Sequence, residues 1–305
     1  MIKVVFFGTP NIAAKSLEHL VNCSDIEVLA VVTQPDKPAG RGNKITMPPI
    51  KELALKYNLP VFQPKSIRKE FEIQEELKKL APDFFVTFAF GQILSQEVLD
   101  IPKYETINLH ASLLPKYRGA NPIQRAIING DKETGICTMI TELGLDCGDV
   151  CLKEIIPISE TMNCEELFNK ISELSPNLIE KTLKGLVSNE IQPTPQGDEG
   201  VCMANKLTKE ETIIDWSKSA KEIHNLVRGI YKFPSAYFIH DNKIIKVLET
   251  KVSECNFDNI GKIVKATKDG VDIACKSGTL TLIKVKPEGK GEMLARDWYN
   301  GIKNR

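Results

Sequence analysis

Three polar side chains in this sequence are of the types that an acyl transfer needs: the amide of Asn108, the imidazole of His110 and the carboxylate of Asp146. Asn108 and His110 close a predicted buried strand, and because they are two residues apart they lie on one face of it. Asp146 belongs to a predicted tight turn at 144–149. An amide can donate to an oxyanion and an acid can orient an imidazole, so the set suits acyl transfer to an external amine, without a covalent intermediate.

These residue types also have ordinary structural roles. Asn and Asp favour turns for backbone reasons, and a single His at the end of a strand often serves the fold. Other catalytic motifs are disfavoured. Gly8 is followed by Thr9 and Pro10 rather than by the spaced glycines of a dinucleotide-binding loop, and the sequence contains neither GxxxxGK[ST] nor GxSxG.

The cysteines indicate a reduced, cytoplasmic protein. Eight cysteines occur in 305 residues, and the apolar stretch at 1–8 is too short for a signal peptide. Cys147, Cys151 and His110 could be imagined as zinc ligands. The sequence has no second close cysteine pair and no HxxxH, however, so we predict no metal site.

The first half of the chain alternates predicted strands and helices. Apolar runs at 3–7, 27–32, 83–88 and 106–109 are typical of buried parallel strands. Helices are predicted at 53–57, 67–80 and 122–128, and Thr9 is the expected N-cap of a further helix that begins at Pro10. Paired strands at 136–141 and 150–156 precede a long helix opened by Asn163 and Glu166. These units predict an α/β fold with a Rossmann-like, mostly parallel sheet.

The pattern changes after residue 189. Residues 190–205 contain two prolines and two glycines with few apolar residues, which is typical of a linker. A helix at 219–229, capped by Ser219 with Glu222, precedes five short predicted strands at 236–240, 243–248, 262–265, 271–275 and 279–285. Five short strands in a stretch of this size predict a small OB-like β-barrel.

Charge is distributed unevenly along the chain. The whole chain has 40 basic and 40 acidic residues, but 1–205 carries a net charge of −6 and 206–305 a net charge of +6. A basic barrel beside an acidic α/β domain suits a nucleic-acid partner. A lysine-rich solvated surface with no partner explains the composition equally well.

A longer run closely resembles a known signature. Residues 108–126, NLHASLLPKYRGANPIQRA, are similar to the motif of the 10-formyltetrahydrofolate-dependent formyltransferases, most of all to those that act on methionyl-tRNA. The similarity extends over the whole chain, including QPDKPAGRG at 34–42, GLDCGD at 144–149, IDW at 214–216 and DWYNG at 297–301. Tyr117 and Asn121 depart from the residues common in the family, Trp and Ala.

The resemblance implies roles for particular residues. Asn108, His110 and Asp146 match the catalytic trio, in which the Asn and His polarise the formyl carbonyl and the Asp orients the His. It further implies a pocket for the co-substrate 10-formyltetrahydrofolate, with no metal. The residues expected to line that pocket are Phe88, Phe90, Gly91, Ile93, Leu94, Ser112, Leu113, Leu114 and Pro115.

The segment 33–56 has a net charge of +3, from five basic and two acidic residues, with two glycines and four prolines. Composition alone favours a solvated loop. The resemblance instead implies a loop that enters the acceptor end of the tRNA, with Lys37, Arg41 and Lys44 as contacts.

We therefore expect a monomeric two-domain enzyme, with a catalytic domain at 1–189, a linker at 190–205 and an OB-like tRNA-binding domain at 206–305. Its expected partners are initiator methionyl-tRNA and the folate co-substrate, and no membrane is involved. One alternative is a folate-dependent formyltransferase for an amino sugar on a nucleotide, which needs no basic platform. Another is a non-catalytic RNA-binding module, against which the intact trio argues.

Overall fold

The computed structural model describes residues 1–39 and 44–303, and the chain folds into two compact units. Unit 1 comprises Met1–Gly119, Thr134–Ile156 and Phe168–Met203, and unit 2 comprises Ala120–Glu133, Pro157–Leu167 and Ala204–Arg305. The chain therefore passes between the units several times, and each unit is described by itself.

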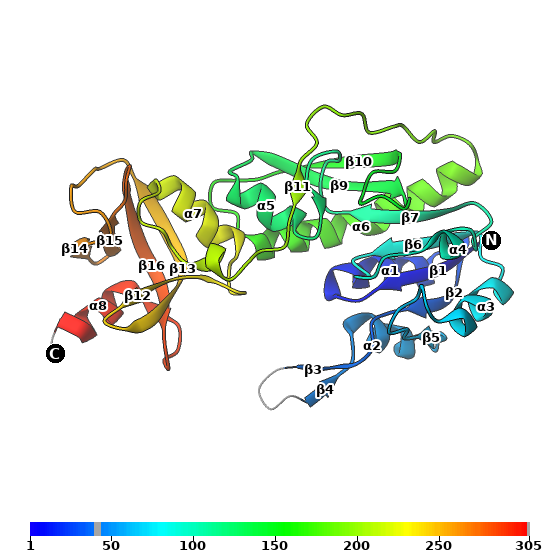
Figure 1. Ribbon diagram of the computed structural model, residues 1–305, viewed down its shortest axis with the longest axis horizontal. Helices are drawn as coiled ribbons and strands as arrows, with labels where there is room; N and C mark the ends of the chain where they lie inside the picture. Colours follow the sequence, from blue (N-terminus) through cyan, green and yellow to red (C-terminus); the bar gives the residue numbers. More distant parts are fainter. Residues whose placement is uncertain (40–43, 304–305) are drawn as a thin grey trace. The chain divides into compact units, whose positions relative to one another are not determined.

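Unit 1 is built on a seven-stranded sheet (Figure 1). In spatial order its strands are β10 (Val150–Pro157), β9 (Glu133–Ile140), β7 (Glu105–His110), β6 (Phe84–Phe88), β1 (Ile2–Gly8), β2 (Ile26–Val32) and β5 (Val61–Phe62). The strands from β7 to β5 pair in parallel, and β9 pairs with β7 in the antiparallel direction. The predicted α/β class with a mostly parallel sheet is confirmed.

Helices pack against this sheet, which explains why its strands β1, β2 and β6 are largely apolar. On one face, Val5 and Phe7 of β1 pack with Leu77 of α3 and Val98 of α4 in a buried cluster. Elsewhere α1 and α6 are joined by a hydrogen bond of 2.7 Å between the hydroxyls of Ser16 and Ser175. The helices that unit 1 holds wholly or in part are η1 (Asn11–Ala13), α1 (Ala14–Asn22), α2 (Pro49–Lys56), α3 (Phe71–Lys79), α4 (Gln96–Leu99) and α6 (Cys164–Val187).

Two local predictions in unit 1 are wrong. Thr9 does not cap a helix, because its hydroxyl donates instead to the carbonyl oxygen of Phe90 at 2.9 Å, and a 3-10 turn follows. Helix α3 begins at Phe71 rather than at Ile67. The backbone of Ile67 is held by side chains, since its N–H binds Gln92 and its carbonyl accepts from Gln74.

Two short strand pairs lie outside the main sheet of unit 1. Strands β3 (Lys37–Ala39) and β4 (Lys44–Thr46) form a hairpin that projects from the rest of the unit in Figure 1. Strand β8 (Arg118–Gly119) pairs with β11 (Met203–Ala204). The end of the predicted linker 190–205 therefore lies beside the formyltransferase-like segment 108–126.

Unit 2 combines helices with a second sheet. Helix α5 packs against α7, and their approach is so close that a Cβ on Gly229 would lie 2.6 Å from the Ile128 side chain. The predicted capping box of α7 is confirmed, since Ser219 and Glu222 exchange hydrogen bonds. The elements of unit 2 are α5 (Pro122–Ile128), η2 (Glu210–Thr212), α7 (Ala220–Gly229), β12 (Ala236–His240), β13 (Lys243–Ser253), β14 (Ile263–Thr267), β15 (Gly270–Ala274), β16 (Thr279–Pro287), β17 (Met293–Leu294) and α8 (Ala295–Lys303).

The predicted barrel is not closed. The five predicted strands form an antiparallel sheet in the order β12-β13-β16-β15-β14, with β17 added beside β16, and no pairing joins β12 to β14 in the described residues. Two amphipathic helices contribute to the core in place of closure. Ile223 and Val227 of α7 and Trp298 of α8 pack into one buried cluster with Phe238 and Leu282 of the sheet. The apolar side chains are thereby buried although the sheet stays open.

Candidate active site

The candidate site begins where β1, β6 and β7 end. Strand order reverses at β1, with β2 and β5 on one side and β6 and β7 on the other, and ligands of open α/β sheets bind at such a point. The loops that follow these strands are tied together. The carbonyl of Phe90 accepts from Thr9 at 2.9 Å and from the Gln34 side chain at 3.2 Å. A Cβ on Gly8 would lie 2.8 Å from the Phe6 ring, so glycine allows the tight exit of β1.

Asn108 is oriented by a neighbour that the sequence did not single out. Thr87 of β6 is in register with Asn108 of β7, and its hydroxyl donates to Asn108 Oδ1 at 2.8 Å. Because the amide oxygen is engaged, the two N–H donors of Asn108 remain for another acceptor. The only hint in the sequence was a threonine in the otherwise apolar strand FFVTF.

His110 is buried, and its two ring nitrogens have different partners. Nε2 lies 2.9 Å from the carbonyl oxygen of Tyr117. A carbonyl oxygen only accepts, so we assign the proton to Nε2. Nδ1 faces Asp146, 3.6 Å from its Oδ2. Nδ1 is therefore the atom of this imidazole that can gain or lose a proton.

Asp146 is held in an unusual backbone conformation, with φ at +48°. Its Oδ2 accepts the backbone N–H of Gly119 at 2.7 Å. The turn around it depends on two glycines. A Cβ on Gly148 would lie 2.1 Å from the backbone oxygen of Ile140, and one on Gly144 would lie 2.2 Å from the Cys147 sulfur. The turn thus brings Asp146 close to His110, although the two residues are 36 positions apart in the sequence.

Two cysteines of the sheet beside this arrangement are poor nucleophiles. Cys137 is paired with His110 across β7 and β9, and burial raises the pKa of its thiol to about 12. Burial also raises the pKa of Cys151 to about 12. Because the thiolate is the reactive form, neither residue supports a covalent route at neutral pH. The arrangement suits direct attack by an external amine.

The residues predicted to line a folate pocket divide into two groups. The side chains of Phe88, Phe90, Leu94, Ser112 and Leu114 are buried. Of these, Phe90 and Leu94 belong to the core cluster of β1 and β6, and the Ser112 hydroxyl donates to the Lys116 carbonyl at 2.6 Å. The others reach the surface: Gly91 and Ile93 are exposed, while Leu113 and Pro115 are half-buried.

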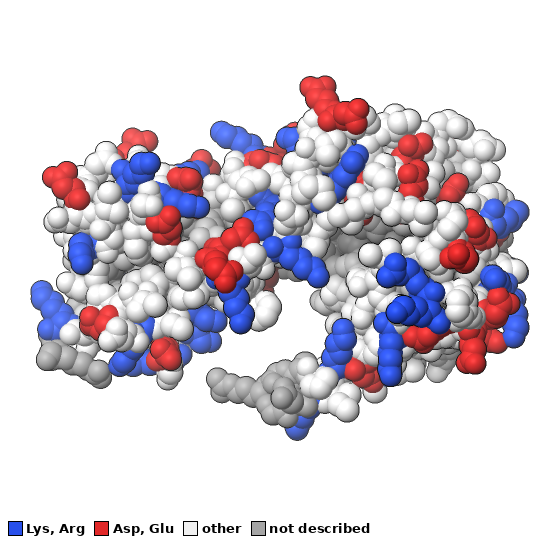
Figure 2. Space-filling model, in the orientation of Figure 1, with Lys and Arg blue, Asp and Glu red and all other residues white. Residues whose placement is uncertain are grey.

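Two of the three predicted tRNA contacts lie on the β3–β4 hairpin. Lys37 and Lys44 are both exposed there, and Arg41 lies outside the described residues. The base of the hairpin is anchored, because Lys51 forms an ion pair of 2.7 Å with Asp36. On the face drawn in Figure 2, basic and acidic side chains are interspersed over both units, so neither unit presents a continuous basic surface in that view.

Family models match two parts of the chain. Residues 2–183 match the model described as formyl transferase, and residues 206–303 match the formyl transferase C-terminal domain. The methionyl-tRNA formyltransferase of Clostridium novyi is 44% identical over 301 residues, which cover 98% of this chain and 97% of that protein. The enzyme of the same name from Clostridium botulinum is 46% identical, over 98% of this chain and 96% of that protein. The chain belongs to the methionyl-tRNA formyltransferase family.

Solved structures show how widely this fold is shared. This member of the methionyl-tRNA formyltransferase family superimposes on the N-formyltransferase from Helicobacter canadensis with a TM-score of 0.68 at 19% identity. The match covers 92% of this chain and 99% of that one. That protein was solved with folinic acid and dTDP-3-aminofucose. HypX from Aquifex aeolicus, solved with tetrahydrofolic acid, gives a TM-score of 0.63 at 16% identity, over 98% of this chain and 46% of that one. At these identities the likeness shows the fold alone.

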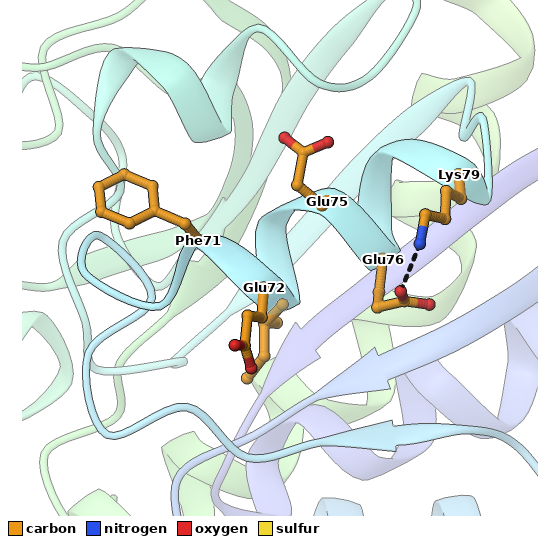
Figure 3. A pocket seen from close by; sticks show the side chains of 6 residues that line it. Phe71, Glu72, Glu75, Glu76 and Lys79 are labelled. Atoms are coloured by element: carbon orange, nitrogen blue, oxygen red, sulfur yellow. Dashed lines mark hydrogen bonds and ion pairs between the residues drawn. The ribbon is translucent and has the colours of Figure 1, made fainter.

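An open hollow of about 600 Å³ lies beside α3, where Figure 3 shows Phe71 and Glu75 projecting from the helix and Glu76 paired with Lys79. It contains none of the predicted site residues.

Within 1–39 and 44–303, no group of three or more His, Cys, Asp and Glu side chains is placed to hold a metal ion. None of the described helices has the length and apolar character needed to cross a membrane.

Proposed function

We propose that this protein transfers the formyl group of 10-formyltetrahydrofolate to the α-amino group of methionine carried by initiator methionyl-tRNA. The observation that carries the proposal is the pairing of His110 with Asp146, two residues along β7 from Asn108, in a chain that is 42–46% identical to methionyl-tRNA formyltransferases. The amine attacks the formyl carbon, the new C–N bond forms, and the bond from that carbon to N10 of the folate breaks. The proton lost by the amine is balanced by one delivered to N10.

The three residues divide this work. The N–H donors of Asn108 stabilise the negative charge that develops on the formyl oxygen as the amine adds. His110 exchanges the proton through Nδ1, because Nε2 is committed to the Tyr117 carbonyl. Asp146, 3.6 Å from Nδ1, stabilises the imidazolium that results. No thiolate or metal enters any of these steps.

The donor is proposed to bind over the ends of β6 and β7. Gly91 and Ile93 follow β6 and are accessible, and Leu113 and Pro115 follow β7. The accessible apolar side chains of Ile93, Leu113 and Pro115 suit the flat ring of a pterin. We assign the buried members of the predicted set, such as Phe90 and Leu114, to the floor beneath this pocket.

The acceptor is proposed to use both parts of the chain. Residues 1–189 would carry the chemistry, 190–205 would be a linker, and 206–305, with net charge +6, would contact tRNA phosphates. Lys37 and Lys44 on the hairpin, together with Arg41, would approach the acceptor end. We also expect the protein to act as a monomer in the reducing cytoplasm, where its eight free cysteines would persist.

A substrate comparison tests this proposal against the amino-sugar alternative. Purified protein and 10-formyltetrahydrofolate are incubated with methionyl initiator tRNA, methionyl elongator tRNA or a dTDP-amino sugar. We expect formyl transfer to the initiator tRNA and none to the sugar. Formylation of the sugar alone would overturn the proposal.

A charge reversal tests the hairpin separately. Because phosphate contacts dominate the affinity for nucleic acid, Lys44→Glu should raise the KM for tRNA and leave the KM for the folate unchanged. Lys15→Glu, on the exposed face of α1, is the matched control. Equal KM values for tRNA in the wild type and Lys44→Glu at moderate salt would contradict a contact between the hairpin and the tRNA.

A further inference from the structure

The segment 190–205 makes specific contacts with the turn that carries Asp146. Thr194 and Val150 exchange two backbone hydrogen bonds of 2.9 Å, and the N–H of Arg118 donates to the carbonyl of Cys202 at 2.9 Å. Both ends of the segment are therefore fixed in unit 1 beside the site. Between these ends lies Gln196, whose half-buried side chain points at the turn 144–149.

Gln196 joins two parts of the site through one amide group. Its Nε2 donates to the backbone carbonyls of Asp146 at 2.9 Å and of Gly148 at 2.7 Å. Its Oε1 accepts from the Arg118 guanidinium at two nitrogens, Nε at 3.1 Å and Nη2 at 2.8 Å. The chemistry fixes the orientation of the amide: a flipped group would set N–H against guanidinium and oxygen against two carbonyls.

Arg118 lies between two residues that hold the catalytic side chains. The carbonyl of Tyr117 accepts from His110 Nε2, and the N–H of Gly119 donates to Asp146 Oδ2. The tripeptide 117–119 thus fixes the imidazole, fixes the carboxylate and, through Arg118 and Gln196, fixes the backbone of the turn. These three attachments flank the contact between His110 and Asp146, whose Nδ1 and Oδ2 lie 3.6 Å apart.

We propose that Gln196, oriented by Arg118, is a positioning residue that holds the 144–149 turn so that the Asp146 carboxylate faces His110. The kinetic test of this proposal rests on the proposed function, whereas the contacts that support it are independent of that function. Asp146 has a positive φ, a conformation that costs free energy in a non-glycine residue and persists only where its surroundings impose it. The two hydrogen bonds from Gln196 to the turn supply part of that constraint.

Two substitutions separate this role from simple support of the fold. Gln196→Glu keeps the shape and the pairing with Arg118 but removes both donors to the turn, whereas Gln196→Ala removes every contact. Both should lower the single-turnover formylation rate about 10- to 100-fold, as expected for a small displacement of a catalytic group, and leave both KM values within about threefold. Gln192→Glu is the matched control, since Gln192 lies exposed in the same segment and donates only to the Asn189 carbonyl at 3.3 Å.

A double-mutant cycle tests whether the effect passes through the carboxylate. In an Asp146→Ala background, Gln196→Glu should cause no further loss of rate. A full additional loss there, or a wild-type rate in Gln196→Glu alone, would overturn the proposal. A uniform fall in thermal stability with unchanged kcat would overturn it too, because that result describes support of the fold only.

A measurement without catalysis keeps the proposal distinct from the proposed function. The amide of Gly119 is protected by Asp146 in the structure, so its hydrogen exchange should become at least about tenfold faster in Gln196→Ala and stay unchanged in Gln192→Ala. Unchanged exchange in both variants would refute the positioning role. If the wild type transfers no formyl group to tRNA, the proposed function fails, and the exchange result still decides the role of Gln196.

Discussion

Replacing Asp146 by Asn removes one charge and little else, so its effect can be worked from the geometry. The carboxylate lies 3.6 Å from His110 Nδ1, with only 18% and 6% of the two side chains exposed. At that distance two unit charges attract by about 1 kcal/mol at the dielectric of water and about 5 kcal/mol at an effective dielectric of 20. If the imidazolium forms as the amine attacks, Asp146→Asn should therefore slow formylation by about 10-fold to several thousand-fold, at about 1.4 kcal/mol for each factor of ten.

The assay is a single-turnover measurement with saturating 10-formyltetrahydrofolate and methionyl initiator tRNA, so that product release does not mask the chemical step. The matched control is Glu142→Gln, which makes the same carboxylate-to-amide change at an exposed position near the turn. We expect the control to retain the wild-type rate. A variant Asp146→Asn that is folded and as fast as the wild type would refute the reasoning that the carboxylate stabilises His110.

Three further results are expected. Thr87→Val should slow formylation about fivefold by leaving the Asn108 amide unanchored, with recovery in Thr87→Ser, and equal rates in all three proteins would exclude the anchor. Gly148→Ala should abolish most activity while the thermal transition of the protein survives, because a Cβ there would meet backbone at 2.1 Å; a fully active variant would contradict that clash. Side-chain hydrogen bonds, first from Lys184, lower the pKa of Glu180 from 4.5 to about 2. The Glu180 carboxylate therefore stabilises the fold above pH 4.5, and this stabilisation is lost as the pH falls from 4.5 towards 2. Glu180→Gln should accordingly lower the melting temperature at pH 7 but not near pH 2, and a difference that is the same at both values would reject the linkage.

Features set by neighbours in the sequence could be predicted. The capping box of Asn163 and Glu166 is present, with two hydrogen bonds of 3.0 Å, because its partners are three residues apart. The predicted strands 236–240 and 243–248 likewise left two residues, Asp241 and Asn242, for the turn, and both have the positive φ that such a hairpin requires. In each case short-range geometry decides the structure.

Features set by the register between distant segments could not be predicted. Thr87 and Asn108 are 21 residues apart, and Gln196 and Asp146 are 50 apart. Hydrophobic periodicity shows which residues face the core, but not which polar groups meet across neighbouring strands. The composition of 190–205 indicated a linker because Pro and Gly report backbone propensity, which carries no information about the hydrogen bonds of Gln196.

The open sheet of unit 2 has a similar explanation. The places of five of its six strands followed from alternating apolar residues and turn signals, whereas β17 was not predicted. Closure depends instead on whether the two edge strands pair, and here the α7 and α8 side chains complete the core without it. The residues predicted to line a folate pocket show the same limit, since the resemblance pointed to Phe90 and Leu94 but only the packing shows that their side chains are buried.

The most direct test of the proposed function is to follow a labelled formyl group. The purified protein is given 10-formyltetrahydrofolate labelled in the formyl carbon together with methionyl initiator tRNA, and the amino acid released from the tRNA is identified by mass. We predict labelled N-formylmethionine from the wild type and at least about 10-fold less per unit time from Asp146→Asn. Unlabelled methionine from the wild type, under conditions where a relative such as the Clostridium novyi enzyme forms the labelled product, would contradict the account.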